Sequence, residues 1–129
     1  MNAQACPCGS GHALEACCGR YHAGESAPDA ERLMRSRYSA FVLGLDAYLL
    51  ATWHPDTRPT ALELETMPPT QWQGLTVKSH QTMDASHATV EFVARYKLNG
   101  RAYKLHEVSR FEQVDGRWFY VDGEIREGG

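Results

Sequence analysis

All four cysteines of the chain lie within its first eighteen residues, at Cys6, Cys8, Cys17 and Cys18. Two pairs of thiolates at the ends of a short loop can wrap one Zn²⁺ ion in the closed tetrahedral arrangement typical of structural zinc. The loop begins with Gly-Ser-Gly, which permits a tight turn because glycine tolerates positive φ. A segment this short buries no core of its own, so the metal must supply its folding energy, about 10 kcal/mol for a structural zinc site. We therefore expect one structural zinc ion held by these four cysteines.

Two disulfides, a redox-active dithiol or four free thiols are the other uses that these cysteines can have. Disulfides are disfavoured in the reducing compartment expected for this chain, and the Cys-x-x-Cys spacing of redox dithiols does not occur in the sequence. His22 offers a further alternative, because it can replace one cysteine as a ligand or donate a hydrogen bond to a bound thiolate. A site with four thiolate ligands has no open position, which indicates a structural rather than a catalytic metal.

The cysteine segment resembles the SEC-C zinc motif. The resemblance is carried by Cys-x-Cys-Gly-Ser-Gly, eight residues between the two cysteine pairs, and then Cys-Cys-Gly. The same motif occurs at the C-terminal end of the bacterial preprotein-translocase ATPase. By analogy, the resemblance implies a protein or ribosomal partner for this segment.

The remainder of the chain is similar to the uncharacterised bacterial YchJ-like family. The similarity extends over nearly the whole chain, through residues 21–24, 27–28, 33–41, 52–58, 109–111 and 116–123. It implies a SEC-C-like zinc knuckle over residues 1–24 and a cone-shaped α+β domain over residues 25–129. Such a domain, called nuclear-transport-factor-2-like (NTF2-like), packs helices on a curved antiparallel sheet and often holds a ligand pocket between the sheet and its long helix.

The residue pattern itself predicts helices in the first half of this domain. Between residues 28 and 50 the apolar side chains recur at spacings of three and four, which is the stripe of an amphipathic helix. Gly44 is suited to end a first helix, and Asp46 is suited to cap a second, short one. Thr60 and Glu63 have the spacing of a capping box, which predicts one more short helix that ends at two prolines.

From Trp72 onward, apolar and polar residues alternate with the period of a half-buried β-strand. Asn99-Gly100 and Asp115-Gly116 are preferred in two-residue hairpins, and residues 84–87 predict a third connection. These turns fix the register of a four-stranded antiparallel meander, because a slip by one residue would turn the apolar set to solvent. Helices followed by a meander predict an α+β fold with the helices on one face of the sheet.

The same register puts polar side chains on the mostly apolar sheet face that meets the helices: Ser79, Gln81, Glu107, Ser109, Gln113 and Asp122. Burying a carboxylate without a partner is costly, so Glu107 and Asp122 must be paired, protonated or hydrated. The candidate cations are Arg35, Arg37, His54, Arg58 and Arg110. Three interpretations stay open at this point: an internal ion-pair cluster, a ligand pocket, and a catalytic acid–base pair.

The pocket interpretation places a site between the long helix, the loop after the helices and the sheet. Its candidate residues are Arg35, Tyr38, His54, Arg58, Trp72, Glu107, Ser109, Tyr120 and Asp122. The leading functional hypothesis is a small zinc-binding protein that acts as a protein-interaction or ligand-binding module. The alternative is a small cone-fold enzyme, a hydrolase or proton-transfer catalyst, with Glu107 or Asp122 as the base and Arg35 or His54 as its electrostatic partner.

Composition restricts the partners and the compartment. The 129 residues carry a net charge of -3, so the overall charge does not favour direct DNA binding. No apolar run approaches the roughly 20 residues that cross a bilayer, and the N-terminal residues do not have the pattern of a secretion signal. We therefore expect a cytoplasmic protein that makes no membrane contact, either a monomer or a homodimer. The pocket interpretation adds a small-molecule ligand in the cone.

Overall fold

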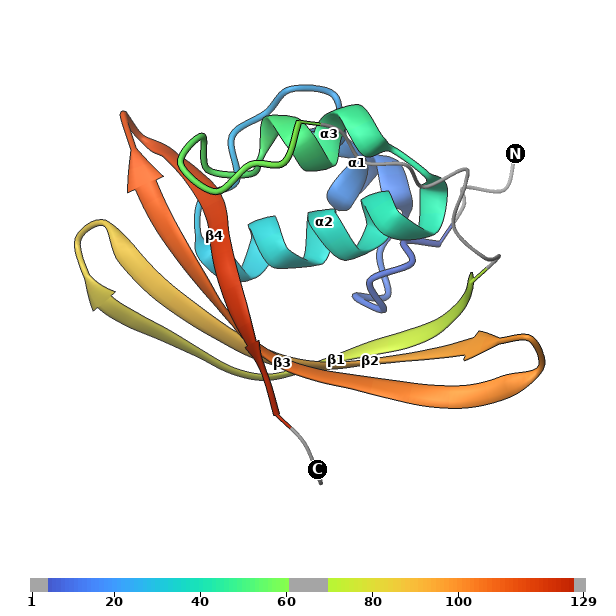
Figure 1. The fold of residues 1–129 in the computed structure, drawn as a ribbon. Coiled ribbons are helices and arrows are strands. Elements are labelled where there is room, and N and C mark those ends of the chain that lie inside the picture. The colour runs from blue at the N-terminus through green and yellow to red at the C-terminus, as the bar shows by residue number, and fades with distance from the viewer. Residues whose placement is uncertain (1–4, 61–69, 127–129) are drawn as a thin grey trace.

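A computed structural model describes residues 5–60 and 70–126 of the chain. In chain order its elements are η1 (Leu14–Ala16), α1 (Cys18–His22), α2 (Ala30–Leu43), α3 (Asp46–Ala51), β1 (Thr70–Asp84), β2 (His87–Leu98), β3 (Arg101–Val114) and β4 (Arg117–Ile125). The strands form one antiparallel sheet in the order β1-β2-β3-β4, which curves around α2 (Figure 1). The other helices lie on the same side of the sheet (Figure 1). The predicted α+β cone with helices on one sheet face is confirmed.

The long helix α2 begins and ends at residues whose chemistry sets its limits. Asp29 caps the first turn, because its Oδ1 accepts a hydrogen bond of 2.8 Å from the backbone N–H of Arg32. Gly44 ends the helix in the left-handed conformation, with a φ of 74°. The break predicted at this glycine is confirmed, and it allows the chain to turn back so that α3 packs beside α2 (Figure 1).

The second helix differs from its prediction in one detail. Asp46 is the first residue of α3 and not its cap, and its Oδ1 accepts a hydrogen bond from the backbone N–H of Ala47. The short helix predicted from Thr60 and Glu63 falls on residues 61–69, which lie outside the described residues. Within residues 5–60 and 70–126, no helix combines the length and the apolar character that a bilayer crossing requires.

The two predicted hairpin turns are present and hold the sheet in register. Asn99 and Asp115 have positive φ values of 53° and 51°, and the glycine after each also has positive φ, as a tight two-residue hairpin requires. Around the first turn the pairing is the predicted one, including Phe92 opposite Glu107. The turn chemistry therefore places Glu107 on the concave face of the sheet.

A register shift in the pairing of β3 with β4 changes what faces the helices. The shift lies between Arg110 and Phe111. Asp122 therefore pairs with Arg110 on the outer face, and Gly123 occupies the place opposite Ser109 that the sequence assigned to Asp122. The prediction that Asp122 shares the inner face is wrong, because strict alternation does not anticipate a bulge.

A second shift, in β1 just before Ser79, has the same kind of effect. Ser79 and Gln81 turn to the outer face, contrary to the prediction. His80 instead lies opposite Val90 on the side of the helices, and its Nδ1 is 3.9 Å from a carboxylate oxygen of Glu31 at the start of α2. Strand β1 thus contains a bulge between Val77 and Ser79 that its alternating sequence does not predict.

The core lies between α2 and the concave face of the sheet. Its buried residues include Ala30, Leu33, Met34, Tyr38, Val90, Phe92, Ala94 and Phe111. Burying each large apolar side chain in such a core contributes roughly 1.5–3 kcal/mol relative to exposure. Cys6, Cys8, Cys18 and Tyr21 belong to the same cluster, so the cysteine segment packs onto the long helix and shares one core with the cone.

Candidate functional site

The four cysteines come together at the N-terminal side of the molecule. Their sulfur atoms all lie within 4.8 Å of one another, and the Sγ atoms of Cys8 and Cys17 are 3.7 Å apart. A tetrahedral site with metal–sulfur bonds of about 2.3 Å places its sulfur atoms about 3.8 Å apart. The donor set of Cys6, Cys8, Cys17 and Cys18 therefore fits one tetrahedral metal ion such as zinc.

Local sequence explains how the short loop brings the two cysteine pairs together. Gly9 follows the first pair with a φ of 80°, which turns the chain back toward the second pair. Gly19 follows the second pair, and a Cβ added there would lie 2.7 Å from the carbonyl oxygen of Leu14. The Ser10 hydroxyl lies 3.1 Å from the Cys17 sulfur, close enough for a hydrogen bond between them. The geometry of the loop thus explains why glycine occupies positions 9 and 19 and why serine occupies position 10.

The protonation of the cluster also points to a cation. A hydrogen bond from Cys18 lowers the pKa of Cys8 to about 4, and the same bond, together with burial, raises the pKa of Cys18. Burial raises the pKa of Cys17 as well. Four thiolates this close repel one another unless a positive ion lies between them. The arrangement is therefore compatible with metal binding coupled to release of thiol protons.

The cysteine segment is attached to α2 by specific contacts. The Cys6 sulfur lies 3.5 Å from the Ser39 hydroxyl, and Arg35 donates a hydrogen bond of 3.2 Å from Nη1 to the carbonyl oxygen of Cys8. Arg35 also pairs with Glu31, at 3.0 Å. One face of α2 is thus occupied by the cysteine loop.

His22 lies outside the sulfur cluster. Its Nε2 is 2.8 Å from the carbonyl oxygen of Ser36, and its ring stands edge-on to Tyr48, 4.7 Å away between centroids. The Tyr48 hydroxyl is in turn 2.7 Å from the Ser36 hydroxyl. The sequence offered His22 as a replacement ligand or as a donor to a thiolate. In the structure, the contact of His22 with Ser36 instead links α1 to α2.

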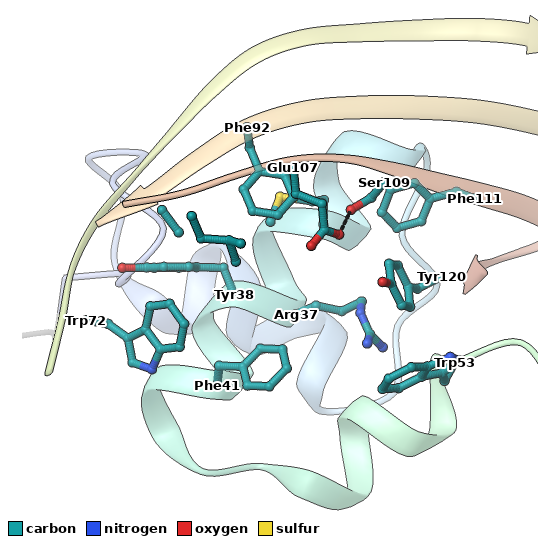
Figure 2. Close-up of a pocket in the computed structure, with 13 residues that line it drawn as sticks. Arg37, Tyr38, Phe41, Trp53, Trp72, Phe92, Glu107, Ser109, Phe111 and Tyr120 are labelled. Carbon is teal, nitrogen blue, oxygen red and sulfur yellow. Dashed lines mark hydrogen bonds between the residues drawn. The ribbon is translucent and has the colours of Figure 1, made fainter. Parts of the chain in front are cut away.

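The second candidate site is a cavity of about 270 Å³ between α2 and the concave face of the sheet (Figure 2). Most of its lining is aromatic: Tyr38, Phe41, Trp53, Trp72, Phe92, Phe111 and Tyr120. Three other polar residues line it, Arg37, Glu107 and Ser109. Within the described ranges, the Trp53 indole N–H is buried and has no hydrogen-bond partner. An apolar cavity with a few polar groups is the usual form of a small-molecule site.

Glu107 reaches the cavity from β3 and is held by its neighbours. Ser109, two residues along the same strand, donates a hydrogen bond of 2.5 Å from its hydroxyl to Glu107 Oε2 (Figure 2). A Cβ added to Gly123 on β4 would lie 2.1 Å from that same oxygen, so only glycine leaves room for the carboxylate there. Sequence reasoning missed this use of Gly123, because it depends on the bulge in β4.

Arg37 reaches the cavity from α2 and is 5% exposed. Its Nη1 donates to the carbonyl oxygen of Leu49 at 2.8 Å and to the Thr52 hydroxyl at 2.7 Å. The guanidinium lies over the rings of Tyr120 and Trp53, 4.6 and 5.3 Å from their centroids. Burial lowers the pKa of Arg37 to about 10, so the group stays charged at neutral pH. Across residues 5–60 and 70–126, no carboxylate lies within 4.0 Å of it to form an ion pair.

Arg35 and Arg37 contact different structures because they are two residues apart on one helix. Two residues turn an α-helix by about 200°, so the two side chains leave it on opposite sides. Arg37 instead shares a stripe with Met34, Tyr38 and Phe41, at spacings of three and four. The spacing of three and four residues along the helix is the sequence signal that places Arg37, and not Arg35, in the cavity.

Tyr38, Trp72, Glu107, Ser109 and Tyr120 line the cavity together, as the pocket interpretation requires. The remaining four candidates do not line the cavity. Arg35 contacts Cys8 and Glu31, and the His54 ring lies 3.5 Å from Glu112. Arg58 donates to the carbonyl oxygen of Trp53, and Asp122 accepts from Arg110. The bulge in β4 places Asp122 on the outer face of the sheet. His54 lies in the loop after α3, and its backbone N–H donates to the carbonyl oxygen of Tyr120. Among the described residues that line the cavity, Glu107 carries the single carboxylate.

Two family models match the chain. The model described as the YchJ middle NTF2-like domain matches residues 29–123, and the SEC-C motif matches residues 3–20. A UPF0225 protein of Bordetella parapertussis is 59% identical over 125 residues, which cover 95% of this chain and 93% of that relative. A UPF0225 protein of Chromobacterium violaceum is 56% identical over 126 residues, which cover 94% of this chain and 93% of the relative.

Two solved structures have the same fold over nearly the whole chain. A SEC-C motif containing protein from Rhodopseudomonas palustris has a TM-score of 0.83 at 34% identity, covering 98% of this chain and 100% of that one. A SEC-C motif containing protein from Psychrobacter arcticus has a TM-score of 0.79 at 30% identity, covering 98% of this chain and 85% of that one. The likeness thus spans the cysteine segment and the cone together.

Proposed function

We propose that this chain, which belongs to the YchJ-like family of UPF0225 proteins with a SEC-C motif, is a small-molecule-binding protein stabilised by a structural zinc ion. The observation that carries the proposal is the aromatic cavity of about 270 Å³ that contains the buried, charged Arg37. Charged side chains are buried in proteins mostly where a partner offsets the loss of hydration. A ligand in the cavity would be that partner.

The zinc ion would be held by Cys6, Cys8, Cys17 and Cys18. When bound, it supplies a fixed link between the two ends of the loop and offers no open coordination position. Three of these cysteines are buried against the cone, which supports a role in holding the knuckle on α2. A reducing compartment such as the cytoplasm would keep the thiols available.

The cavity residues divide into two groups by their chemistry. Tyr38, Trp72 and Tyr120 offer ring faces and edges that suit a flat apolar body. Glu107 and Ser109 offer a carboxylate and a hydroxyl that suit hydrogen-bond donors on a ligand. A volume of about 270 Å³ suits a molecule with one or two rings.

A second candidate function uses the same cavity for proton transfer, with Glu107 as the base. The observation that favours it is the Ser109 hydroxyl, which fixes the orientation of the carboxylate. Glu107→Gln distinguishes the two functions, since it removes a base but keeps a side chain of nearly the same shape. Binding without turnover in the native chain supports the binding function.

A protein partner would contact the knuckle at its polar side. A groove of about 330 Å³ beside Cys17 is lined by three arginines, Arg20, Arg32 and Arg35, and by Glu31, which pairs with Arg35. These arginines suit an acidic segment of a partner. This contact is separate from the cavity, which lies on the other face of α2.

Tryptophan indole N–H resonances provide the test of small-molecule binding. Trp53 and Trp72 line the cavity, and Trp118 does not, so it serves as an internal control. We expect small aromatic compounds to shift the indole resonances of Trp53 and Trp72 in a saturable way and to leave Trp118 unchanged.

Ala94→Leu is the matched control variant, because Ala94 is buried and lines the cavity. The added side chain should abolish binding while a thermal melt shows that the variant is folded. Equal binding by the variant, or shifts confined to Trp118, would place the compounds elsewhere and contradict the proposal.

A further inference from the structure

We infer that the ligand of the cavity is a small flat molecule with one carboxylate, and that Arg37 binds this carboxylate side-on. The inference rests on the proposed function, and it names the chemical class of the ligand.

The contacts of Arg37 use only one end of its guanidinium. Among the described residues, both of its hydrogen bonds come from Nη1, to Leu49 and Thr52. The Nε and Nη2 groups on the other edge keep two parallel N–H donors. Two parallel donors at this spacing match the two oxygens of a carboxylate, which is the strongest form of an arginine–anion contact.

The flanking rings hold the guanidinium in one plane. Tyr120 and Trp53 lie against it, and they stand edge-on to each other at 5.1 Å. Ring faces attract a cation but provide no hydrogen-bond acceptor of carboxylate strength. The packing thus fixes the direction of the free N–H edge. Glu107 acts on the guanidinium across the cavity, but no carboxylate of the described residues forms an ion pair with it.

The cavity has an apolar end opposite Arg37. Trp72 and Phe41 lie at that end, 6.1 Å apart between ring centroids, and Tyr38 stands edge-on to Trp72 at 5.6 Å (Figure 2). A ligand that spans the cavity would place a flat apolar body among these rings and its anionic group at Arg37. The arrangement selects against a molecule that is charged at both ends.

Glu107 restricts the ligand further. Its carboxylate faces the same cavity and would repel a second negative charge, which disfavours dicarboxylates. Its Oε2 accepts from Ser109, and the Tyr120 hydroxyl also interacts with this carboxylate, whose two oxygens keep further acceptor positions toward the cavity. A monocarboxylate with a hydroxyl group would satisfy both Arg37 and Glu107.

Two probes of almost equal shape test the inference. Cinnamate carries a carboxylate, and cinnamamide replaces it by a neutral amide. Titrations of the zinc-loaded chain, followed by the indole resonances of Trp53 and Trp72, should give cinnamate an affinity at least about tenfold higher. Arg37→Gln should remove this preference, with the affinity for cinnamamide changed by less than about twofold.

Glu107→Gln gives a second test in the opposite direction, and it does not depend on the folding of the Arg37 variant. Removing the repulsive charge should tighten the binding of cinnamate and leave cinnamamide nearly unchanged. Cinnamamide that binds native chain as tightly as cinnamate, or a Glu107→Gln variant that weakens cinnamate, overturns the carboxylate inference and leaves small-molecule binding intact. If neither these probes nor neutral aromatic compounds shift Trp53 and Trp72, the proposed function fails as well.

Discussion

Helix α2 separates two regions that are assembled in different ways. On one face, Arg35 and Ser39 contact the cysteine loop, whose donors all lie within residues 6–18. On the other face, four residues of α2 from Met34 to Phe41 line a cavity whose remaining walls come from Trp53 and the four strands. The knuckle is a local structure that depends on coordination, whereas the cavity depends on strand register and packing. Although both regions contribute to one buried core, a change in one should therefore affect binding at its own site more than binding at the other.

The double variant Cys8→Ser and Cys18→Ser should have the largest effect. It removes one sulfur from each pair, so bound zinc should fall from one equivalent to none. The lost coordination corresponds to as much as about 10 kcal/mol of folding energy for the segment. Elemental analysis and urea unfolding measure both quantities.

His22→Gln is the matched control for the cysteine variant, because His22 contacts Ser36 and lies outside the sulfur cluster. It should keep one equivalent of zinc. Retention of zinc by the double cysteine variant, or its loss from the His22 variant, would show that the ligand set is different.

Phe111→Ala should have the next largest effect, and it acts on the cone. Phe111 is almost fully buried and lines the cavity, so truncation should lower the free energy of unfolding by about 3–5 kcal/mol. The variant should still bind one zinc ion per chain under native conditions. A parallel loss of zinc would mean that the two regions are not independent.

Zinc affinity should fall steeply with decreasing pH. Burial raises the pKa of Cys17, and the hydrogen bond between Cys18 and Cys8 raises the pKa of Cys18. Both thiols therefore stay protonated at neutral pH and must lose their protons to bind the ion. Cys8, with a pKa of about 4, is already ionised there. Because Cys17 and Cys18 each lose a proton, apparent affinity should rise by a factor of about one hundred or more per pH unit between about pH 6 and 8. A competition titration with a chelator of known pH dependence measures it, and a pH-independent affinity would refute the coupling.

Two glycine variants should give the smallest effects, about 1–3 kcal/mol each, and they sharpen the comparison. Gly19→Ala presses a Cβ on the Leu14 backbone and should weaken zinc binding. Gly123→Ala presses on the Glu107 carboxylate and should leave zinc binding unchanged while it alters binding in the cavity. Zinc titration and cinnamate titration of both variants distinguish these outcomes. The same response from both would contradict the separation of the two regions.

The cysteine cluster was predictable because its information is local. Spacing, turn glycines and residue type together indicate four donors around one ion, and the sulfur atoms do converge. The hairpin turn at Asn99 likewise gave the register of β2 against β3, and the turn at Asp115 gave that of β3 against β4 as far as the bulge, because their residue types dictate the backbone conformation.

The cavity was only partly predictable because bulges and helix faces decide its lining. A bulge leaves no mark in an alternating pattern, so Asp122 was assigned to the inner face and Gly123 was overlooked. Arg37 was among the candidate cations for the inner face, but the candidate pocket residues included Arg35 from the same helix instead. At the polar groups of a binding site, the position that the local sequence pattern predicts often differs from the position that tertiary packing gives.

A crystal structure of the zinc-loaded chain with cinnamate tests the proposed function most directly. We predict an anomalous peak at the zinc edge among the four cysteine sulfurs. We also predict density for the probe between Trp72 and Arg37, with its carboxylate on Nε and Nη2. Probe density on the outer surface, or a cavity that stays free of probe while the metal site is filled, would contradict the proposal that the cone binds small molecules.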